Sequence, residues 1–540
     1  MFASYEKNEP SQRRVTLPSS IKSFTIDRVK RKEILILILC LLVGFALRFY
    51  TFDQKSFWVD EVYTFNDSRD GLKEQLKFYK ENPAYLHPPL FFILTHQFYP
   101  FTKPERDLRI IPLIFGTLSI VMIYFLSRSF SPNIALPCTL SLTFMAYHIS
   151  LSQDGRSYSL LMFFGMMGLY FFMKHLKTQK KLYLVFVALF FAILFHTSYS
   201  SIPFIALSQI LWFYRPRDED KKPVLSSFLI LNGLILLFCL SWIIFVVVNY
   251  KGQPLMDPRH IESPGSFWYI LQGVLHDWVP YAPLMIVSVI LLILFPIFSK
   301  CKENALILLA VFVLPIGGLY LICKLLNITH FFTSRYFVNF LPLFFITLFL
   351  SLDAMEVRFE RLRRFLRLRL LFVILFIASN LIILPLYYSS EKQDFRGLVT
   401  YLKGRIRDGD KIVVGGTAFI PAILHYFGAY PKGRHHSLAG WKVSGKEIEY
   451  RIVLVYQNIK FTILYSESHW FQYFSDGSRL WIVADKKHGK RLKEEFPCIL
   501  KGYFDGSFLN LNRFPYDVSM YLLLWDPFSP DEKGIDMPIE

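Results

Sequence analysis

Long apolar runs, separated by short polar or basic segments, fill most of the first 388 residues of the chain. A helix needs about 20 residues to cross a bilayer, and tilt or local thinning of the bilayer tolerates a somewhat shorter run. Hydrophobic residues make up 53% of the chain, and the mean hydropathy is +0.35. These features predict a polytopic α-helical membrane protein. The predicted spans cover about residues 33–51, 108–127, 134–151, 157–174, 182–197, 199–215, 225–250, 280–299, 304–326, 335–353 and 367–388.

The positions of the basic residues predict the topology. Residues 1–32 are polar and end in a basic cluster, so the first run is predicted to be an uncleaved span that follows a cytoplasmic N-terminal segment. If the segment 87–102 does not cross the membrane, every basic loop lies inside; if it crosses, all of them lie outside, against the positive-inside rule. We therefore predict that 87–102 is re-entrant or interfacial, which leaves eleven spans. The basic loops are 174–181, 215–222, 300–302 and 358–369.

This topology divides the chain into three parts. Residues 33–388 form a transmembrane domain whose loop 52–107 faces outward, and residues 389–540 form an extracytoplasmic domain. Within this tail, 395–406 has helical spacing, and several short apolar runs bounded by Gly or Pro are typical of buried strands. The tail is therefore predicted to be a soluble α/β domain. The predicted strands are 411–415, 461–465, 480–484 and 521–525.

Charge and cysteine content exclude several functions. The net charge of +18 raises the question of nucleic-acid binding, but the excess lies at the ends of the apolar runs, where topology explains it. The six cysteines form no CxxC pair, and most lie in or beside apolar runs, so they indicate neither a disulfide framework nor a thiolate metal site.

Two acids in the first outward loop are the strongest candidates for chemistry. Asp60 and Glu61 follow the first span closely, between Trp58 and Tyr63. Placing carboxylates at an aromatic-rich interface carries a desolvation cost, and a carboxylate there can serve as a general base or a metal ligand. A solvated loop acid with no catalytic role is the alternative, which the residues alone leave open.

The surrounding sequence resembles the polytopic GT-C glycosyltransferases. RFY…SFWVDEVYTF followed by LHPPLFFIL is similar to protein O-mannosyltransferases, which carry an acidic pair in the same loop and an HPPL segment after it. Lipid A aminoarabinose transferases and family-39-like bacterial transferases share this layout. YHISLSQDGRSYSLLMFFG and FTSRYFVNFLPL resemble two further segments of the superfamily. The resemblance covers about residues 40–390.

The resemblance implies a hexosyl- or pentosyltransferase that uses a polyprenyl-phosphate sugar donor at the outer membrane face. Asp60 would deprotonate the acceptor hydroxyl, and Glu61 would orient the acceptor or assist. The charge of the leaving lipid phosphate calls for cations, which Arg156 and Arg335 would supply. His87 lies where some relatives place a cationic residue near the donor phosphate. Tyr158, His196 and Tyr336 are further candidate substrate contacts. The alternatives are an interfacial aromatic for Tyr158 and a polar residue at a helix end for His196. Relatives differ in metal use, so a divalent ion bound by Asp60 and Asp154 stays an alternative.

Two other classes of function remain as alternatives. A lipid or glycan transporter or flippase would suit the many spans, but no repeat of halves is visible, and the polar residues gather on one side of the membrane. A membrane-anchored binding or assembly protein would work through 389–540. The expected partners of a transferase are the lipid-linked donor, a glycan, lipid or protein acceptor, and membrane lipids, and the expected location is a bacterial inner membrane.

Overall fold

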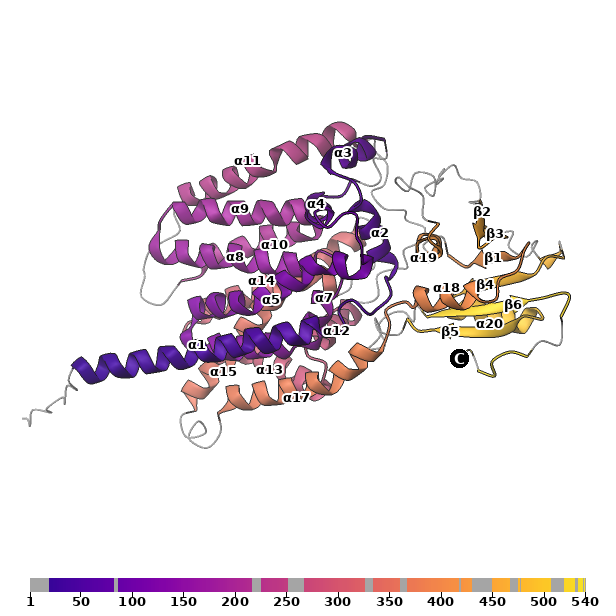
Figure 1. The fold of residues 1–540 in the computed structure, drawn as a ribbon. Coiled ribbons are helices and arrows are strands. Elements are labelled where there is room, and N and C mark those ends of the chain that lie inside the picture. Colours follow the sequence, from indigo (N-terminus) through magenta and orange to yellow (C-terminus); the bar gives the residue numbers. More distant parts are fainter. Residues whose placement is uncertain are drawn as a thin grey trace, which may run out of the picture.

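The computed structural model confirms the predicted fold class, a helical membrane domain followed by a small α/β domain. It describes residues 19–81, 86–215, 225–250, 267–325, 334–359, 367–416, 419–429, 449–466, 474–475, 477–506, 519–529, 533–537 and 539. In Figure 1 the helices run side by side in an elongated bundle. The sheet lies beyond one end of this bundle, and α1 extends past the other.

Each predicted apolar run coincides with helix. The long helices of the bundle are α1 (Ser19–Phe49), α5 (Pro104–Phe130), α8 (Tyr158–Thr178), α9 (Leu182–Thr197), α11 (Leu225–Asn249), α13 (Ala282–Phe298), α14 (Lys302–Leu325), α15 (Leu341–Arg358) and α17 (Leu368–Ser389). Shorter or broken elements complete it: α6 (Pro132–Phe144), α7 (Ala146–Ser152), η2 (Tyr199–Ser201), α10 (Ile202–Leu207), η3 (Ser208–Phe213), α12 (Phe267–Trp278) and η5 (Ser334–Phe340).

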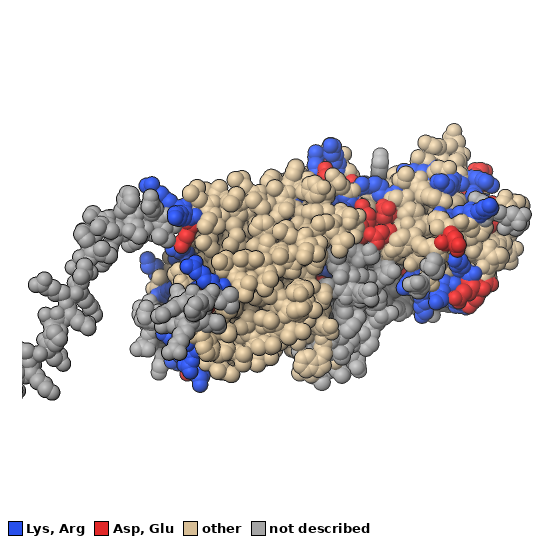
Figure 2. Space-filling view, turned by 90° about the horizontal axis from the view of Figure 1, so that it is seen from below, with Lys and Arg blue, Asp and Glu red and all other residues tan. Residues whose placement is uncertain are grey.

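By length and composition, five helices within the described residues can cross a membrane, or seven if two bent helix pairs are each one span. The count of eleven therefore stays a prediction. Figure 2 shows that charged residues on this face gather toward the two ends of the molecule and leave a wide uncharged band between them, and many exposed side chains of the bundle helices are large and apolar. Such a band is what a protein surrounded by lipid presents, so the chain is an integral membrane protein.

The first outward loop folds into three short helices: α2 (Val59–Asp67), α3 (Leu72–Glu81) and α4 (Leu90–His96). With seven residues, α4 is far shorter than the about 20 residues that a span requires. Because α5 begins at Pro104, the segment 87–102 has no room for a transmembrane helix. This agrees with a re-entrant or interfacial segment.

The C-terminal domain follows α17 through a linker, residues 390–394. Its elements are α18 (Phe395–Lys403), β1 (Lys411–Val414), α19 (Phe419–Phe427), β2 (Glu449–Tyr456), β3 (Ile459–Ser466), β4 (Leu480–Ala484), α20 (Lys486–Glu495), β5 (Ile499–Phe504) and β6 (Met520–Trp525). The sheet order is β2-β3-β1-β4-β6-β5, with β1 parallel to β3 and β4 and the other pairs antiparallel. The four predicted strands correspond to β1, β3, β4 and β6; β2, β5, α19 and α20 were not predicted.

The membrane domain and the C-terminal domain share one hydrophobic core at their junction. Phe57, Val62 and Leu108 are almost fully buried and belong to the same cluster as the apolar residues of α18, α19 and the sheet. Burying apolar area of this kind stabilises the contact by about 25 cal/mol per Å². The C-terminal domain therefore packs directly on α2 and its preceding loop, at one end of the bundle (Figure 1).

Candidate active site

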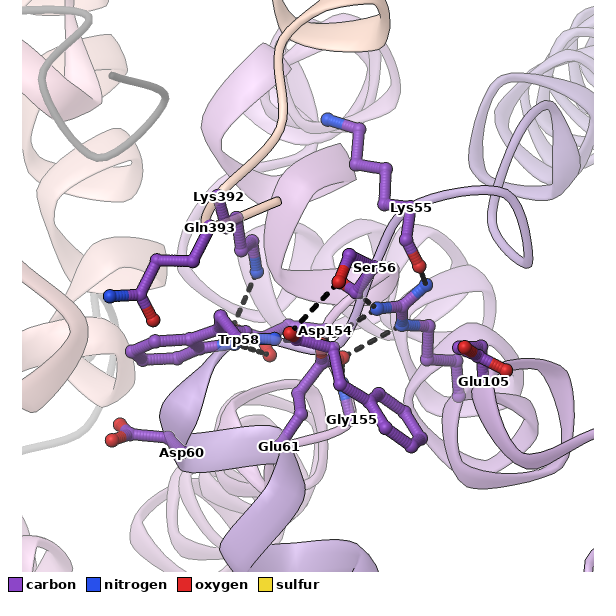
Figure 3. Close-up of polar contacts among 12 residues, drawn as sticks. Lys55, Ser56, Trp58, Asp60, Glu61, Glu105, Asp154, Gly155, Lys392 and Gln393 are labelled. Carbon is purple, nitrogen blue, oxygen red and sulfur yellow. Dashed lines mark hydrogen bonds and ion pairs between the residues drawn. The ribbon is translucent and has the colours of Figure 1, made fainter. Parts of the chain in front are cut away.

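The helix α2 begins at the junction of the two domains and carries both candidate acids in its first turn. The side chain of Glu61 turns back toward the start of the helix, where Trp58 N donates to Glu61 Oε2 at 3.4 Å. A helix leaves its first N–H groups without intrahelical partners, and an acid in the first turn satisfies one of them and complements the helix dipole. Figure 3 shows Asp60 pointing away from Glu61, so the two carboxylates lie in different environments.

Glu61 is fully buried in an ion pair with Arg109 at the start of α5. Arg109 Nε donates to Glu61 Oε1 and Arg109 Nη2 to Glu61 Oε2, both at 2.7 Å, and Gly155 N donates to Oε1 at 2.6 Å. With Trp58 N, four donors occupy the two oxygens. Glu61 therefore has no free oxygen for an acceptor, and its position does not match the acceptor-orienting role that the resemblance implies.

Arg109 also fixes the loop that leads into α2. Its two terminal nitrogens donate to the carbonyl oxygens of Phe52, Lys55 and Ser56 at 3.0–3.1 Å. One guanidinium group thus satisfies three backbone carbonyls and one carboxylate in a site that excludes water. The Glu61–Arg109 pair is the structural centre of the loop before Asp60.

Asp60 is the accessible acid of the pair. Its side chain is 28% exposed, and Oδ2 lies 3.3 Å from Nη1 of Arg335 on η5. Arg156 Nη1 donates to the backbone oxygen of Asp60 at 3.2 Å and to Thr64 Oγ1 at 2.8 Å. Two predicted cations thus meet the predicted base, although 275 residues separate Asp60 from Arg335. The partly exposed carboxylate thus pairs with the Arg335 guanidinium, while Arg156 binds the backbone of the same residue.

The aromatic partners of the predicted site lie around the same group. Arg335 is stacked over Trp58, with 5.1 Å from its Cζ to the ring centroid, and lies 5.7 Å from the Tyr336 ring. The side chain of Tyr158 is buried and lies close enough to Arg156 for their charges to interact. Predicted residues from α2, the turn before α8, and η5 thus converge at one end of the bundle.

The two predicted histidines have different positions. His87 lies before α4, close enough to Arg156 for their charges to interact. The side chain of His87 is exposed to solvent, and the protein atoms around it, followed by the Arg156 charge, lower its pKa. His196, by contrast, hydrogen-bonds the backbone oxygen of Phe238 on α11 through Nε2 at 3.1 Å. The structure does not bring His196 to the acids, because its ring is used in helix packing.

The geometry does not fit a metal ion between Asp60 and Asp154. Asp154 is buried, and it accepts from Trp58 Nε1 at 3.0 Å and pairs with Lys392 Nζ at 2.9 Å, while Asp60 pairs with Arg335. A hard divalent cation takes about six or more oxygen ligands, usually including free carboxylates. Within the part of the chain that is described, no three His, Cys, Asp or Glu side chains group as a metal site. We therefore derive no step through a metal ion.

Three residues of this junction were missed from the sequence. Arg109 lies just inside a predicted span, and a charge in that position signals a buried partner. Lys392 and Gln393 lie in the linker and reach α2 and Asp154 from 230 or more residues away, as Figure 3 shows. Their side chains carry no local sequence signal.

Together, the bundle, the acid-bearing helix and the appended sheet give the chain the GT-C glycosyltransferase fold. A family model described as dolichyl-phosphate-mannose-protein mannosyltransferase matches residues 86–245, a stretch that includes His87, Arg156 and Tyr158 but not Asp60 or Arg335. A search among curated proteins gives no match.

The fold assignment rests on ArnT from Cupriavidus metallidurans in its apo state. That structure is 12% identical, with a TM-score of 0.55 over 92% of this chain and 98% of ArnT. ArnT bound to undecaprenyl phosphate gives 12% identity and a TM-score of 0.49, over 91% of this chain and 97% of ArnT. An Archaeoglobus fulgidus oligosaccharyltransferase tethered to an acceptor peptide gives 11% identity and a TM-score of 0.49, over 85% of this chain and 70% of the oligosaccharyltransferase chain.

The linker acid Glu391 gives a pH prediction. Its Oε2 accepts from Ser56 N at 3.0 Å; burial, and next the Asp394 charge, raise the pKa of Glu391 from 4.5 to about 7. The folded protein therefore holds this proton more tightly than the unfolded chain, so the stabilisation is present below about pH 4.5 and is lost as the pH rises through 7. We expect the thermal unfolding midpoint of the wild type, compared with that of Glu391→Gln, to decrease as the pH is raised from 5 to 8. If the unfolding midpoints of the two proteins changed in parallel with pH, the pKa of Glu391 would not be raised by folding.

Proposed function

We propose that this chain is a glycosyltransferase that moves a sugar from a polyprenyl-phosphate donor to an acceptor hydroxyl at the outer face of the membrane. The observation that carries the proposal is the partly exposed Asp60 carboxylate paired with Arg335, with Arg156 bound to the backbone of the same residue, at one end of the bundle. A general base needs accessibility and reach to the hydroxyl proton, and a departing phosphate needs fixed cations. The match to the mannosyltransferase family model supports the same class of donor.

In the proposed reaction, Asp60 removes the proton of the acceptor hydroxyl as that oxygen attacks the anomeric carbon of the donor sugar. The bond from this carbon to the phosphate oxygen breaks, and the polyprenyl phosphate leaves with both electrons of that bond. Arg335 and Arg156 stabilise its negative charge, and Tyr158, Tyr336 and His87 line the donor phosphate region. Arg335 pairs with Asp60 in the structure. The donor phosphate would compete for this arginine and free the carboxylate to act as base.

The polar site lies at one end of the bundle, which supports chemistry at a membrane surface more than transport through the bilayer, where binding residues gather near the midplane. The proposed location is the extracytoplasmic face of a bacterial inner membrane, because the basic loops lie at the opposite end of the predicted topology.

Cells lacking the protein provide the test, with mass spectrometry of their lipid-linked sugars and their glycans. We expect one polyprenyl-phosphate sugar to accumulate and one glycan to be a residue short, which would also identify the sugar and the acceptor. The purified protein should then release polyprenyl phosphate from that donor only when the acceptor is present. Unchanged donor and glycan profiles, together with loss of lipid movement across the membrane, would favour a flippase.

A further inference from the structure

We propose that Lys392 and Gln393, in the linker to the C-terminal domain, are positioning residues for Asp60. The inference rests on the proposed function, because it assigns a role in the same reaction. The role that we assign to each side chain requires no direct contact with Asp60. Each acts through a group that holds it: Gln393 through the first turn of α2, and Lys392 through Asp154 and Trp58.

Gln393 completes the hydrogen bonding at the start of α2. Its side-chain Oε1 accepts from Val59 N at 3.0 Å, one residue before Asp60. The first N–H groups of a helix have no intrahelical acceptor, and a side-chain oxygen placed there stabilises the first turn. Trp58 N is satisfied by Glu61, and the amides of Glu61 and Val62 donate to Trp58 O. The linker therefore supplies an acceptor that the loop itself does not provide to Val59.

Lys392 holds the other side of the same turn. Its ammonium pairs with buried Asp154 at 2.9 Å and lies 5.4 Å from the Trp58 ring centroid. Asp154 in turn accepts from Trp58 Nε1 at 3.0 Å, which fixes the plane of the indole (Figure 3). Arg335, the ion-pair partner of Asp60, stacks over this indole. A chain of contacts thus runs from the linker through Asp154 and Trp58 to the cation beside the base.

The C-terminal domain sets the position of the linker. Asp505, which follows β5, accepts from Glu391 N through Oδ2 at 3.2 Å and from Asp394 N through its backbone oxygen at 3.0 Å. On α18, Arg396 N donates to Ser56 Oγ at 3.1 Å, and Arg396 pairs with Glu105 at 2.7 Å. The linker is therefore held from both sides, by the sheet and by the catalytic loop. The C-terminal domain accordingly contributes to the geometry of the base as well as facing the acceptor compartment.

The test compares Gln393→Ala with Gln393→Glu, and Lys392→Met with Lys392→Arg, in the purified full-length protein. A displacement of about 1 Å at a catalytic group costs on the order of 100-fold in rate. We expect kcat to fall about 10- to 100-fold in Gln393→Ala and Lys392→Met, with the donor KM changed less than about threefold. Gln393→Glu keeps the acceptor oxygen and should restore most of kcat. Lys490→Met, at an exposed lysine of α20, is the matched control and should behave as wild type.

Amide hydrogen exchange provides a second readout that does not depend on activity. Gln393→Ala should speed exchange in the peptide that covers 58–64, and Gln393→Glu should not. Unchanged exchange in Gln393→Ala, or faster exchange with wild-type kcat, would overturn the positioning role. If exchange became faster in Gln393→Ala but the wild type transferred no sugar from any donor, the proposed function would be refuted. The Gln393 contact would then be purely structural, and the positioning role would be refuted as well.

Discussion

Asp60→Asn is expected to lower kcat for sugar transfer by about 10²- to 10⁴-fold, the usual contribution of a positioned general base. The amide has the same shape but accepts no proton at neutral pH. The protein should still insert and fold, because the Asp60 side chain is 28% exposed and its ion pair with Arg335, at 3.3 Å, resembles surface pairs that contribute about 0–1 kcal/mol. Transfer is measured as the release of polyprenyl phosphate by the purified enzyme.

Asp53→Asn is the matched control for this variant. Asp53 lies seven positions earlier in the same loop and is exposed. The same chemical change there should leave kcat within about twofold of wild type, as for a surface position remote from the chemistry. If Asp60→Asn retained wild-type transfer, another group would have to accept the proton, and the assignment of Asp60 would be wrong.

The second large effect concerns the buried pair of Glu61 and Arg109. Removing one member of a buried ion pair costs about 3–5 kcal/mol, because the remaining charge is left without a partner in a site that excludes water. Arg109→Met should be the more damaging change, since it also leaves the carbonyls of Phe52, Lys55 and Ser56 without their donor. Glu61→Gln keeps the shape and part of the hydrogen bonding, so its cost should be smaller.

The measurement is the thermal unfolding midpoint of each purified variant in the same detergent. The double variant Glu61→Leu with Arg109→Met removes both charges and should recover part of the stability that Arg109→Met loses, but not all of it, because the carbonyls stay unsatisfied. Arg451→Met, at an exposed arginine of β2, controls for loss of positive charge. An unchanged midpoint in Arg109→Met would mean that the pair does not hold the loop.

The membrane bundle was predictable because apolar runs of sufficient length fold into helices whatever their distant partners are. The positions of the buried strands β1, β3, β4 and β6 were predictable for a similar local reason, because short runs of β-branched and aromatic residues lie between Gly, Pro and polar residues. Both signals lie within about 20 residues, which is the range in which sequence pattern determines local structure.

The partners of each charged group were not predictable in the same way. Asp60 and Glu61 are adjacent and alike in sequence, yet one is half exposed beside Arg335 and the other is fully buried against Arg109. The bidentate contact from Arg109, together with the backbone donors of Gly155 and Trp58, distinguishes Glu61 from Asp60. Lys392 likewise reads as an ordinary linker residue, and its role depends on Asp154, which is 238 positions earlier in the chain. Pairings at that separation follow from how the helices pack, and the local periodicity of hydrophobic residues does not predict them.

The central claim is that Asp60, the arginines and the C-terminal domain share one extracytoplasmic compartment. Labelling of intact cells with a membrane-impermeant maleimide tests it, using a cysteine-free background with single cysteines at exposed Lys73, Lys460 or Thr178. Lys73→Cys and Lys460→Cys, at the end of the molecule that holds the site, should label in intact cells. Thr178→Cys, at the last residue of α8 and the other end of the molecule, should label only after the membrane is opened. Labelling of Lys73→Cys and Lys460→Cys from opposite sides would contradict the account.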